Sequence, residues 1–137
     1  MVGEQFHDII DGNPKLAALQ LMWIAAILSA LIDNIPFTAA MIPVLSGLQM
    51  DGVNVSVLWW ALAMGVGMGG NGTHIGSTAN VYIVTISERL AKETGNPAMA
   101  ITPGLWLRKG TPVMLITLVL CSLFIWFGYD YLYIPSP

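Results

Sequence analysis

Two apolar runs of this chain are long enough to enter a lipid bilayer, and each is interrupted midway by polar or glycine residues. The first interruption is Asp33-Asn34-Ile35-Pro36, and the second is the Gly-Gly-Asn-Gly-Thr-His-Ile-Gly stretch at 69–76. Because hydrocarbon offers no hydrogen-bonding partner, backbone freed from a helix at bilayer depth must be satisfied by protein or water. The interruptions therefore predict two helix breaks that line a cavity inside a membrane.

The composition indicates a membrane protein. Only 9% of the 137 residues are charged and the mean hydropathy is +0.70, whereas soluble domains carry about 25% charged residues. Asp33 is the only charge between Leu16 and Met50, and the stretches 52–87 and 110–129 have none. We predict an integral multi-pass protein of the plasma membrane, with the lipid bilayer as a partner. Nucleic acid is not predicted as a partner, because the net charge of −3 comes from scattered residues.

The predicted fold class is an all-α membrane protein. Its expected parts are a polar segment at 1–15, a hairpin at 16–48, a discontinuous transmembrane helix at 55–94, an interfacial connector at 98–109, a final transmembrane helix at 110–129 and a tail at 130–137. In the hairpin, 33–36 forms the turn, and the arm at 37–48 is too short to span a bilayer. We therefore expect a re-entrant hairpin, and a transmembrane helix followed by a buried loop is the alternative.

The basic residues predict an orientation. Arg89, Lys92, Arg108 and Lys109 all lie between the two predicted spans, and the loop at 49–54 and the C-terminal tail carry no basic residue. By the positive-inside rule, the segment from Arg89 to Lys109 is cytoplasmic. The mouth of the hairpin and the C-terminus then face outward.

Asp33 is the first candidate for a functional residue. An ionisable group inside a membrane segment is costly, and it marks a function by default. The alternative is structural, because an Asp before Asn-Ile-Pro can cap the returning helix. Asn34 and Thr38 add hydrogen-bonding groups to the same turn, and Asp33 and Asn34 are candidate sodium ligands.

The glycine-rich break is the second candidate site. N–H groups that begin the half-helix from Ala79 favour an anion, and carbonyls that end the half-helix at Met68 favour a cation. Neutral polar side chains add donors and acceptors, and with Gly72 they make the predicted second half of the site: Asn71, Thr73, Ser77 and Asn80. The alternative is a hinge or a packing surface, since Gly65 and Gly69 form a small-xxx-small pair. If the break binds ligand, we expect Gly65→Ala to be mild.

Other motifs carry little chemistry. Gly67-Met68-Gly69-Gly70-Asn71-Gly72 matches a dinucleotide fingerprint, but no strand precedes it. His74 has no plausible metal-binding partner, and Cys121 is a lone cysteine in an apolar helix. We predict no catalytic residue, no metal site and no organic cofactor; Na⁺ or H⁺ is the candidate coupling ion.

The two motifs in order resemble one protein family. Residues 33–43 (Asp-Asn-Ile-Pro-Phe-Thr-Ala-Ala-Met-Ile-Pro), followed by Gly69-Gly70-Asn71-Gly72-Thr73 and Gly76-Ser77-Thr78-Ala79-Asn80-Val81, are similar to the C-terminal part of the ion transporter superfamily. The resemblance is to the arsenite permease and melanosomal P protein branch, in the citrate-transporter-like group, and it covers about Leu16 to Tyr129. In the dicarboxylate branch the hairpin tip carries Ser-Asn-Thr and binds sodium. This chain keeps Asn34 between Asp33 and Ile35, which favours a carboxylate that can be protonated.

The resemblance implies an ion-coupled secondary transporter that moves a small anion or inorganic ion of the arsenite, citrate or sodium–proton class by alternating access. It implies two inverted repeats, so an N-terminal half of the same transporter is an expected partner, and a second copy of the chain is another. The alternative is a small non-transporting membrane subunit or scaffold, and an intramembrane enzyme ranks third. The sequence leaves open the substrate, the coupling ion, symport or antiport, and the oligomeric state.

Overall fold

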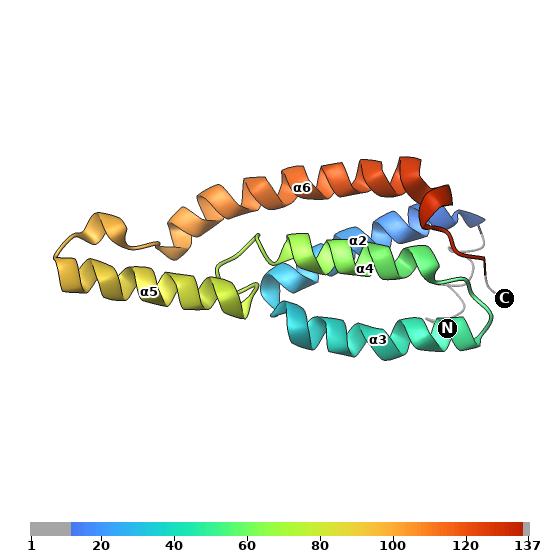
Figure 1. The fold of residues 1–137 in the computed structure, drawn as a ribbon, viewed down its shortest axis with the longest axis horizontal. Helices are drawn as coiled ribbons and strands as arrows, with labels where there is room; N and C mark the ends of the chain where they lie inside the picture. The colour runs from blue at the N-terminus through green and yellow to red at the C-terminus, as the bar shows by residue number, and fades with distance from the viewer. Residues whose placement is uncertain (1–11, 136–137) are drawn as a thin grey trace.

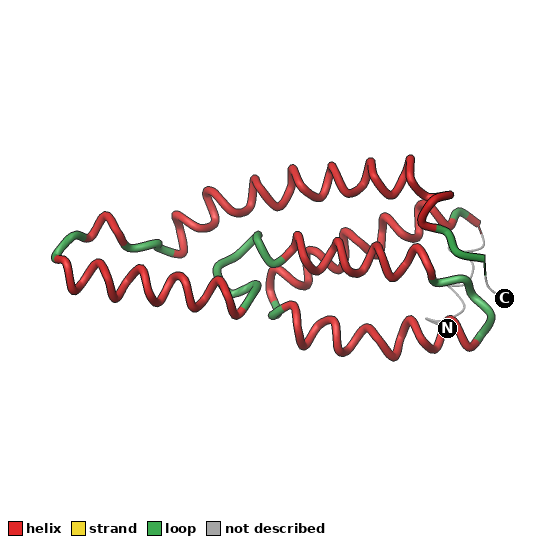
Figure 2. Tube along the Cα trace, viewed as in Figure 1, coloured by secondary structure: helices red, strands yellow, loops and turns green. Residues whose placement is uncertain are grey.

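Helices joined by short loops make up most of the described chain. The computed structural model describes residues 12–135, and it contains no strand in that range (Figures 1 and 2). The elements are α2 (Pro14–Leu31), α3 (Asn34–Met50), α4 (Ser56–Gly69), α5 (Thr78–Thr94), the 3₁₀ turn η1 (Pro97–Met99) and α6 (Pro103–Leu132). The predicted all-α class is confirmed.

The turn between α2 and α3 is shorter than predicted. We expected residues 33–36 to be non-helical, but α3 already begins at Asn34. Asp33 is the reason, because its carboxylate accepts a hydrogen bond from the Ile35 amide at 3.2 Å and so caps the helix. The arm is also longer than expected, with 17 residues that continue through Pro43. In Figure 1, α3 turns back in the direction from which α2 came.

Two helices occupy the stretch 55–94 that is predicted as a discontinuous transmembrane helix. In Figure 1, α4 and α5 follow one another along the long axis of the molecule, and the loop 70–77 separates them. Gly95 ends α5 with φ of +66°, a left-handed conformation that glycine adopts without strain. Of the other elements, α5 contacts only η1.

The segment 98–109, predicted as an interfacial connector, is mostly helical, and the last helix begins earlier than the predicted span at 110–129. Thr102 caps α6 by accepting a hydrogen bond from the Leu105 amide at 3.2 Å, and Pro103 needs no partner at the first helical position. The last helix therefore has 30 residues, a length of about 45 Å. It exceeds a hydrocarbon core of about 30 Å.

Small residues bring α2 and α4 into close contact. Ala18, Ala25, Ala26, Gly65 and Gly69 are all buried where the two helices meet. A methyl group on Gly69 would lie 2.6 Å from the Ala26 Cα, and one on Gly65 would lie 3.0 Å from the Ala25 Cβ and still closer to the carbonyl oxygen of Met22. The expectation that Gly65→Ala is mild is therefore wrong, because its Cβ would meet backbone that cannot move aside.

The outer faces are strongly apolar. Two helical stretches are long and apolar enough to cross a membrane: Pro14–Leu31, with mean hydropathy 1.6, and Pro97–Leu132, with mean hydropathy 2.1. Large exposed side chains on α6 include Ile116, Leu120 and Phe127. On α3 the only buried residue is Leu45. These faces suit contact with lipid or with further apolar protein.

Candidate functional site

Four helix ends meet in the middle of the molecule. The turn between α2 and α3 lies beside the loop between α4 and α5, as the ribbon shows (Figure 1). The junction therefore combines the C-terminal ends of α2 and α4, which carry partial negative charge, with the N-terminal ends of α3 and α5, which carry partial positive charge. We refer to residues 29–34 together with 70–80 as the junction.

Asp33 links two helix N-termini. One carboxylate oxygen accepts from the Ile35 amide in the first turn of α3, and the other accepts from the Thr78 hydroxyl, at the start of α5. The carboxylate is the acceptor in both hydrogen bonds, and both therefore favour its ionised form. The only acidic residue of the apolar hairpin thus occupies the place at the α5 N-terminus where an anion would be stabilised.

Asn34 joins the hairpin to both sides of the glycine break. Its amide lies 2.5 Å from Ser29 Oγ, 2.7 Å from the Gly76 carbonyl oxygen and 3.3 Å from that of Val66. Because two of these three neighbours are carbonyls, the NH₂ group faces them and donates. There is no room for a side chain at Gly70, where a Cβ would lie 2.7 Å from the Asn34 amide.

Ser29 is a junction residue that the sequence did not reveal. It is the buried polar side chain of the described core, with an exposed fraction of 0%. Its hydroxyl donates to the Val66 carbonyl at 3.1 Å, across the α2–α4 interface. A serine inside an apolar helix usually bonds its own backbone, so only its position one turn before Asp33 could have drawn attention to it.

The carbonyls of the break are already hydrogen-bonded. The Asn80 amide donates to Gly70 O at 2.7 Å and to Thr73 O at 3.2 Å, while the Thr73 hydroxyl donates to Ala30 O on the hairpin. Asn80 and Thr73 therefore hold the loop in shape. The Thr73 carbonyl also accepts from the Gly76 amide at 3.3 Å, so of these two carbonyls only that of Gly70 keeps a second lone pair available to a cation.

Two predicted site residues stand apart from this network. The Thr38 hydroxyl donates to the Asn34 carbonyl of its own helix at 2.8 Å. Ser77 occupies the N-cap position of α5, but its side chain makes no capping hydrogen bond. Neither side chain therefore contributes to the contact between hairpin and break.

Helix α6 supplies further contacts that the sequence did not predict. Trp106 Nε1 donates to the Asn71 carbonyl at 3.1 Å, and the Thr111 hydroxyl donates to the Gly72 carbonyl at 3.0 Å. Gly72 is buried, and a Cβ there would lie 2.5 Å from Met114 Sδ. Sequence reasoning assigned Trp106 to a connector, and only its helical position in the structure brings it to the break.

A cavity of about 500 Å³ lies between the break and the start of α6. It is lined by one amide, one lysine and a mainly apolar set of neighbours: Asn71, Lys109, Ile101, Leu105, Trp106, Gly110 and Val113. Asn71 therefore faces α6 and not the hairpin. Within residues 12–135, no group of three His, Cys, Asp or Glu side chains could hold a metal ion.

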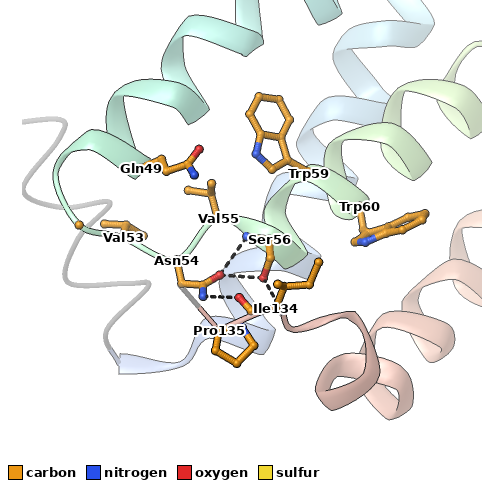
Figure 3. A pocket seen from close by; sticks show the side chains of 10 residues that line it. Gln49, Val53, Asn54, Val55, Ser56, Trp59, Trp60, Ile134 and Pro135 are labelled. Atoms are coloured by element: carbon orange, nitrogen blue, oxygen red, sulfur yellow. Dashed lines mark hydrogen bonds between the residues drawn. The ribbon is translucent and has the colours of Figure 1, made fainter. Parts of the chain in front are cut away.

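A second cavity, of about 570 Å³, lies at the opposite end of α4 (Figure 3). Asn54 donates to the Ile134 carbonyl at 2.8 Å and accepts from the Ser56 hydroxyl at 2.7 Å, so it ties the C-terminal segment to the start of α4. Trp59 and Trp60 complete the walls, and none of the described residues that line the cavity is ionisable. This arrangement indicates a structural role.

Comparison with known proteins identifies the class. The sequence profile of the citrate transporter family matches residues 1–65. The 46 kDa membrane protein of Mycobacterium leprae is 36% identical over 124 residues, which are 88% of this chain and 27% of that protein. The human P protein is 48% identical over 96 residues, 64% of this chain and 12% of that protein. An uncharacterized transporter of Mycobacterium tuberculosis (strain ATCC 25618 / H37Rv) is 35% identical over 125 residues, 89% of this chain and 28% of that protein.

These matches relate the chain to membrane proteins of the transporter class. The predicted resemblance is confirmed: the chain is related to the citrate transporter family and is homologous to P proteins and mycobacterial transporters. It spans about a quarter or less of the length of these relatives. No solved structure matches it.

Proposed function

We propose that this chain forms part of an ion-coupled secondary transporter that moves a small anion or inorganic ion by alternating access. The observation that carries the proposal is the junction, where Asp33 contacts Thr78 and Asn34 reaches the Gly76 carbonyl. A hairpin tip that meets a broken helix is the arrangement in which secondary transporters place substrate and coupling ions. The uncharacterized mycobacterial transporters to which the chain is similar support the same class.

The charges at the junction favour a defined role for Asp33. Its carboxylate is held by donors from α3 and α5, and a cation such as Na⁺ or H⁺ would compete with these donors for the same oxygens. An anionic substrate would compete with the carboxylate itself for the N-terminus of α5. In either case, binding would break the contact between Asp33 and Thr78, which is one of the links between the hairpin and the broken helix.

The remaining parts of the proposal concern the surroundings. The hairpin would be re-entrant, with its mouth outside the plasma membrane and the segment from Arg89 to Lys109 in the cytoplasm. A second, inverted repeat would supply the other half of the site. The ligands from this chain would be Asp33, Asn34, Thr38, Asn71, Gly72, Thr73, Ser77 and Asn80. The apolar outer face of α3, where only Leu45 is buried, leaves a surface for the other repeat.

A non-transporting subunit is the second candidate function. It is favoured by the completeness of the junction, since Asn80 and Asn34 already satisfy the carbonyls of the break. In that case the two interruptions serve only to join the helices. The two functions differ in whether the charge of Asp33 is needed.

Asp33→Asn in the natural protein that carries this sequence separates them. Asparagine is as good an N-cap as aspartate, so α3 should persist while the charge is lost. For a transporter, we expect flux of citrate, arsenite, Na⁺ or H⁺ into liposomes to fall by about tenfold or more, since a charged hydrogen bond is worth roughly 1.5–3 kcal/mol.

Asp51→Asn is the matched control, because Asp51 lies at the other end of α3. Its flux should equal that of the unaltered protein. Flux that persists with its pH dependence in Asp33→Asn would refute the transport role of Asp33 and favour the subunit.

A further inference from the structure

We propose that Trp106 and Thr111 of α6 are positioning residues for the glycine break, and that ion binding at the junction depends on the hydrogen bonds they donate. Trp106 Nε1 donates to the Asn71 carbonyl at 3.1 Å, and the Thr111 hydroxyl donates to the Gly72 carbonyl at 3.0 Å. This role rests on the transport function proposed above, and it adds α6 to the elements that shape the ion site.

The glycine break has little means of holding its own shape. Several of residues 70–77 are glycines, which add backbone freedom and offer no side chain for packing. The amides of Asn71 and Gly72 close short turns onto the carbonyls of Met68 and Gly69, at 3.2 and 2.9 Å. These turns leave the carbonyls of residues 71 and 72 without a partner in the break. Among the described residues, only Trp106 and Thr111 donate hydrogen bonds to these two carbonyls.

One face of α6 is shaped to receive this backbone. Trp106 and Gly110 are four residues apart, so they lie on the same side of the helix. A Cβ at Gly110 would lie 2.8 Å from Trp106 Nε1 and still closer to the Asn71 carbonyl oxygen. Glycine at this position therefore allows the carbonyl to reach the indole, and the Thr111 hydroxyl follows as the second donor.

Helix α6 is itself fixed to the helix pair that carries the hairpin and the break. It packs on both α2 and α4, and its residues Leu118 and Ile125 are fully buried. Farther along α6, the Ser122 hydroxyl accepts from Trp23 Nε1 on α2 at 3.0 Å. The two donors of α6 therefore hold the carbonyls of the break at a defined place relative to the hairpin.

The two hydrogen bonds bear on the ion site through Gly70. The Gly70 carbonyl accepts from Asn80 and keeps a lone pair available to a cation. Because peptide units are planar, only the two backbone torsions of Asn71 separate this carbonyl from the one that Trp106 holds. Without Trp106 the Asn71 peptide can turn, and the Gly70 carbonyl is less firmly directed. An ion must then order the loop as it binds, which lowers its affinity.

Threonine variants separate the hydrogen bond from the packing of α6. Thr111→Val keeps the shape of the side chain and removes the hydroxyl, whereas Thr111→Ser keeps the hydroxyl. Thr117→Val is the matched control, because the Thr117 hydroxyl donates within α6, to the carbonyls of Val113 at 2.8 Å and Met114 at 2.9 Å. Trp106→Phe removes the other donor and keeps an aromatic ring.

The first test is hydrogen exchange of the full chain in phosphatidylcholine nanodiscs, measured by mass spectrometry. Amides of the loop 70–77 should exchange about threefold to tenfold faster in Thr111→Val and Trp106→Phe, as for loss of one hydrogen bond. Thr111→Ser and Thr117→Val should stay within about twofold of the unaltered chain, and α2 should exchange as before in all variants. Unchanged loop exchange in Thr111→Val or Trp106→Phe, or an equal increase in Thr117→Val, would overturn the proposal.

The second test is flux of citrate, arsenite, Na⁺ or H⁺ in liposomes that contain the natural protein. Thr111→Val should raise the apparent KM for the transported ion by about threefold or more and leave the maximal rate within about twofold, because binding is weakened and not the later step. A purely structural role would lower the maximal rate through loss of folded protein and leave KM unchanged, and that result would overturn the proposal. If the unaltered protein shows no flux, the transport function fails, and the exchange comparison alone decides the positioning role.

Discussion

The α2–α4 helix pair is held in two different ways along its length. In the last turns of the two helices, Ala25 and Ala26 pack directly on Gly65 and Gly69, and no polar side chain takes part in these contacts. One turn further along α2, Ser29 begins the junction, where hydrogen bonds replace packing. The same two helices thus change from a dry contact, which has no polar side chain, to a hydrogen-bonded one close to the point where helical backbone ends.

The difference has a physical cause. In a helix interior, every backbone carbonyl is bonded within the helix, so close contact needs only small side chains. Where α2 and α4 end, carbonyls such as Ala30 O and Gly70 O lose those partners, and polar side chains must satisfy them. The dry part of the contact can therefore only hold the helices together. In the junction, by contrast, a hydrogen-bonding group can exchange its protein partner for another one, such as an ion.

The largest loss of stability is expected for a substitution in the dry part of the α2–α4 contact. Gly69→Leu places a side chain against the Ala26 backbone, which cannot rotate away, and we expect a loss of more than about 3 kcal/mol, at the upper end of overpacking. Unfolding in mixed dodecyl maltoside and SDS micelles, followed by tryptophan fluorescence, measures it.

Gly67→Leu is the control for that substitution. Gly67 lies in the same helix, is exposed, and has no atom within 4 Å of its Cβ position. It should cost less than about 1 kcal/mol, since added leucine also improves helix propensity over glycine. Equal losses at both positions would show that α2 and α4 do not pack as described.

An intermediate loss of stability is expected for a substitution where the glycine break meets α6. A Cβ at Gly72 would lie 2.5 Å from Met114 Sδ, the end of a flexible side chain, so Gly72→Ala should cost about 1–3 kcal/mol. In a Met114→Ala background the same substitution should cost clearly less, because the shortest of its contacts is then removed. A double-mutant cycle on unfolding free energies measures this coupling. Zero coupling would place the strain elsewhere.

Much of the fold, and less of the site, could be predicted from the sequence. The charge-free stretches predict the helices and most of their ends, and Gly95 predicts the end of α5. The start of α6 was missed because Thr102 and Pro103 form a helix start within residues that look like an interfacial connector. The predicted hairpin turn is too long. Asp33 is a possible helix cap in the sequence, but the prediction assigns Asn34 to Pro36 to the turn, whereas they belong to α3.

The sequence shows that the break contains polar residues, but it does not predict their individual contacts. Asn80 and Asn34 serve the backbone, whereas Asn71 faces α6. Trp106 and Thr111 lie more than thirty positions from the carbonyls they contact (|i−j| of 35 and 39). Such pairings depend on how helices pack, and local sequence patterns do not encode them.

The smallest effect is expected at the boundary between the two regions. Ser29 is fully buried, and its hydroxyl satisfies the Val66 carbonyl and contacts the Asn34 amide. Ser29→Ala fits the same space but removes that donor, so we expect a loss of about 1–2 kcal/mol from unmade hydrogen bonding.

Ser122→Ala tests whether this loss belongs to the junction. Ser122 also lies on a helix contact, where it accepts from Trp23 Nε1 at 3.0 Å, but it is far from the glycine break. Both variants should lower the unfolding free energy to a similar extent, while only Ser29→Ala should speed hydrogen exchange at amides of the loop 70–77, measured by mass spectrometry. If Ser122→Ala loosens that loop equally, the dry and polar regions are one cooperative unit. The separation drawn from their contacts would then be wrong.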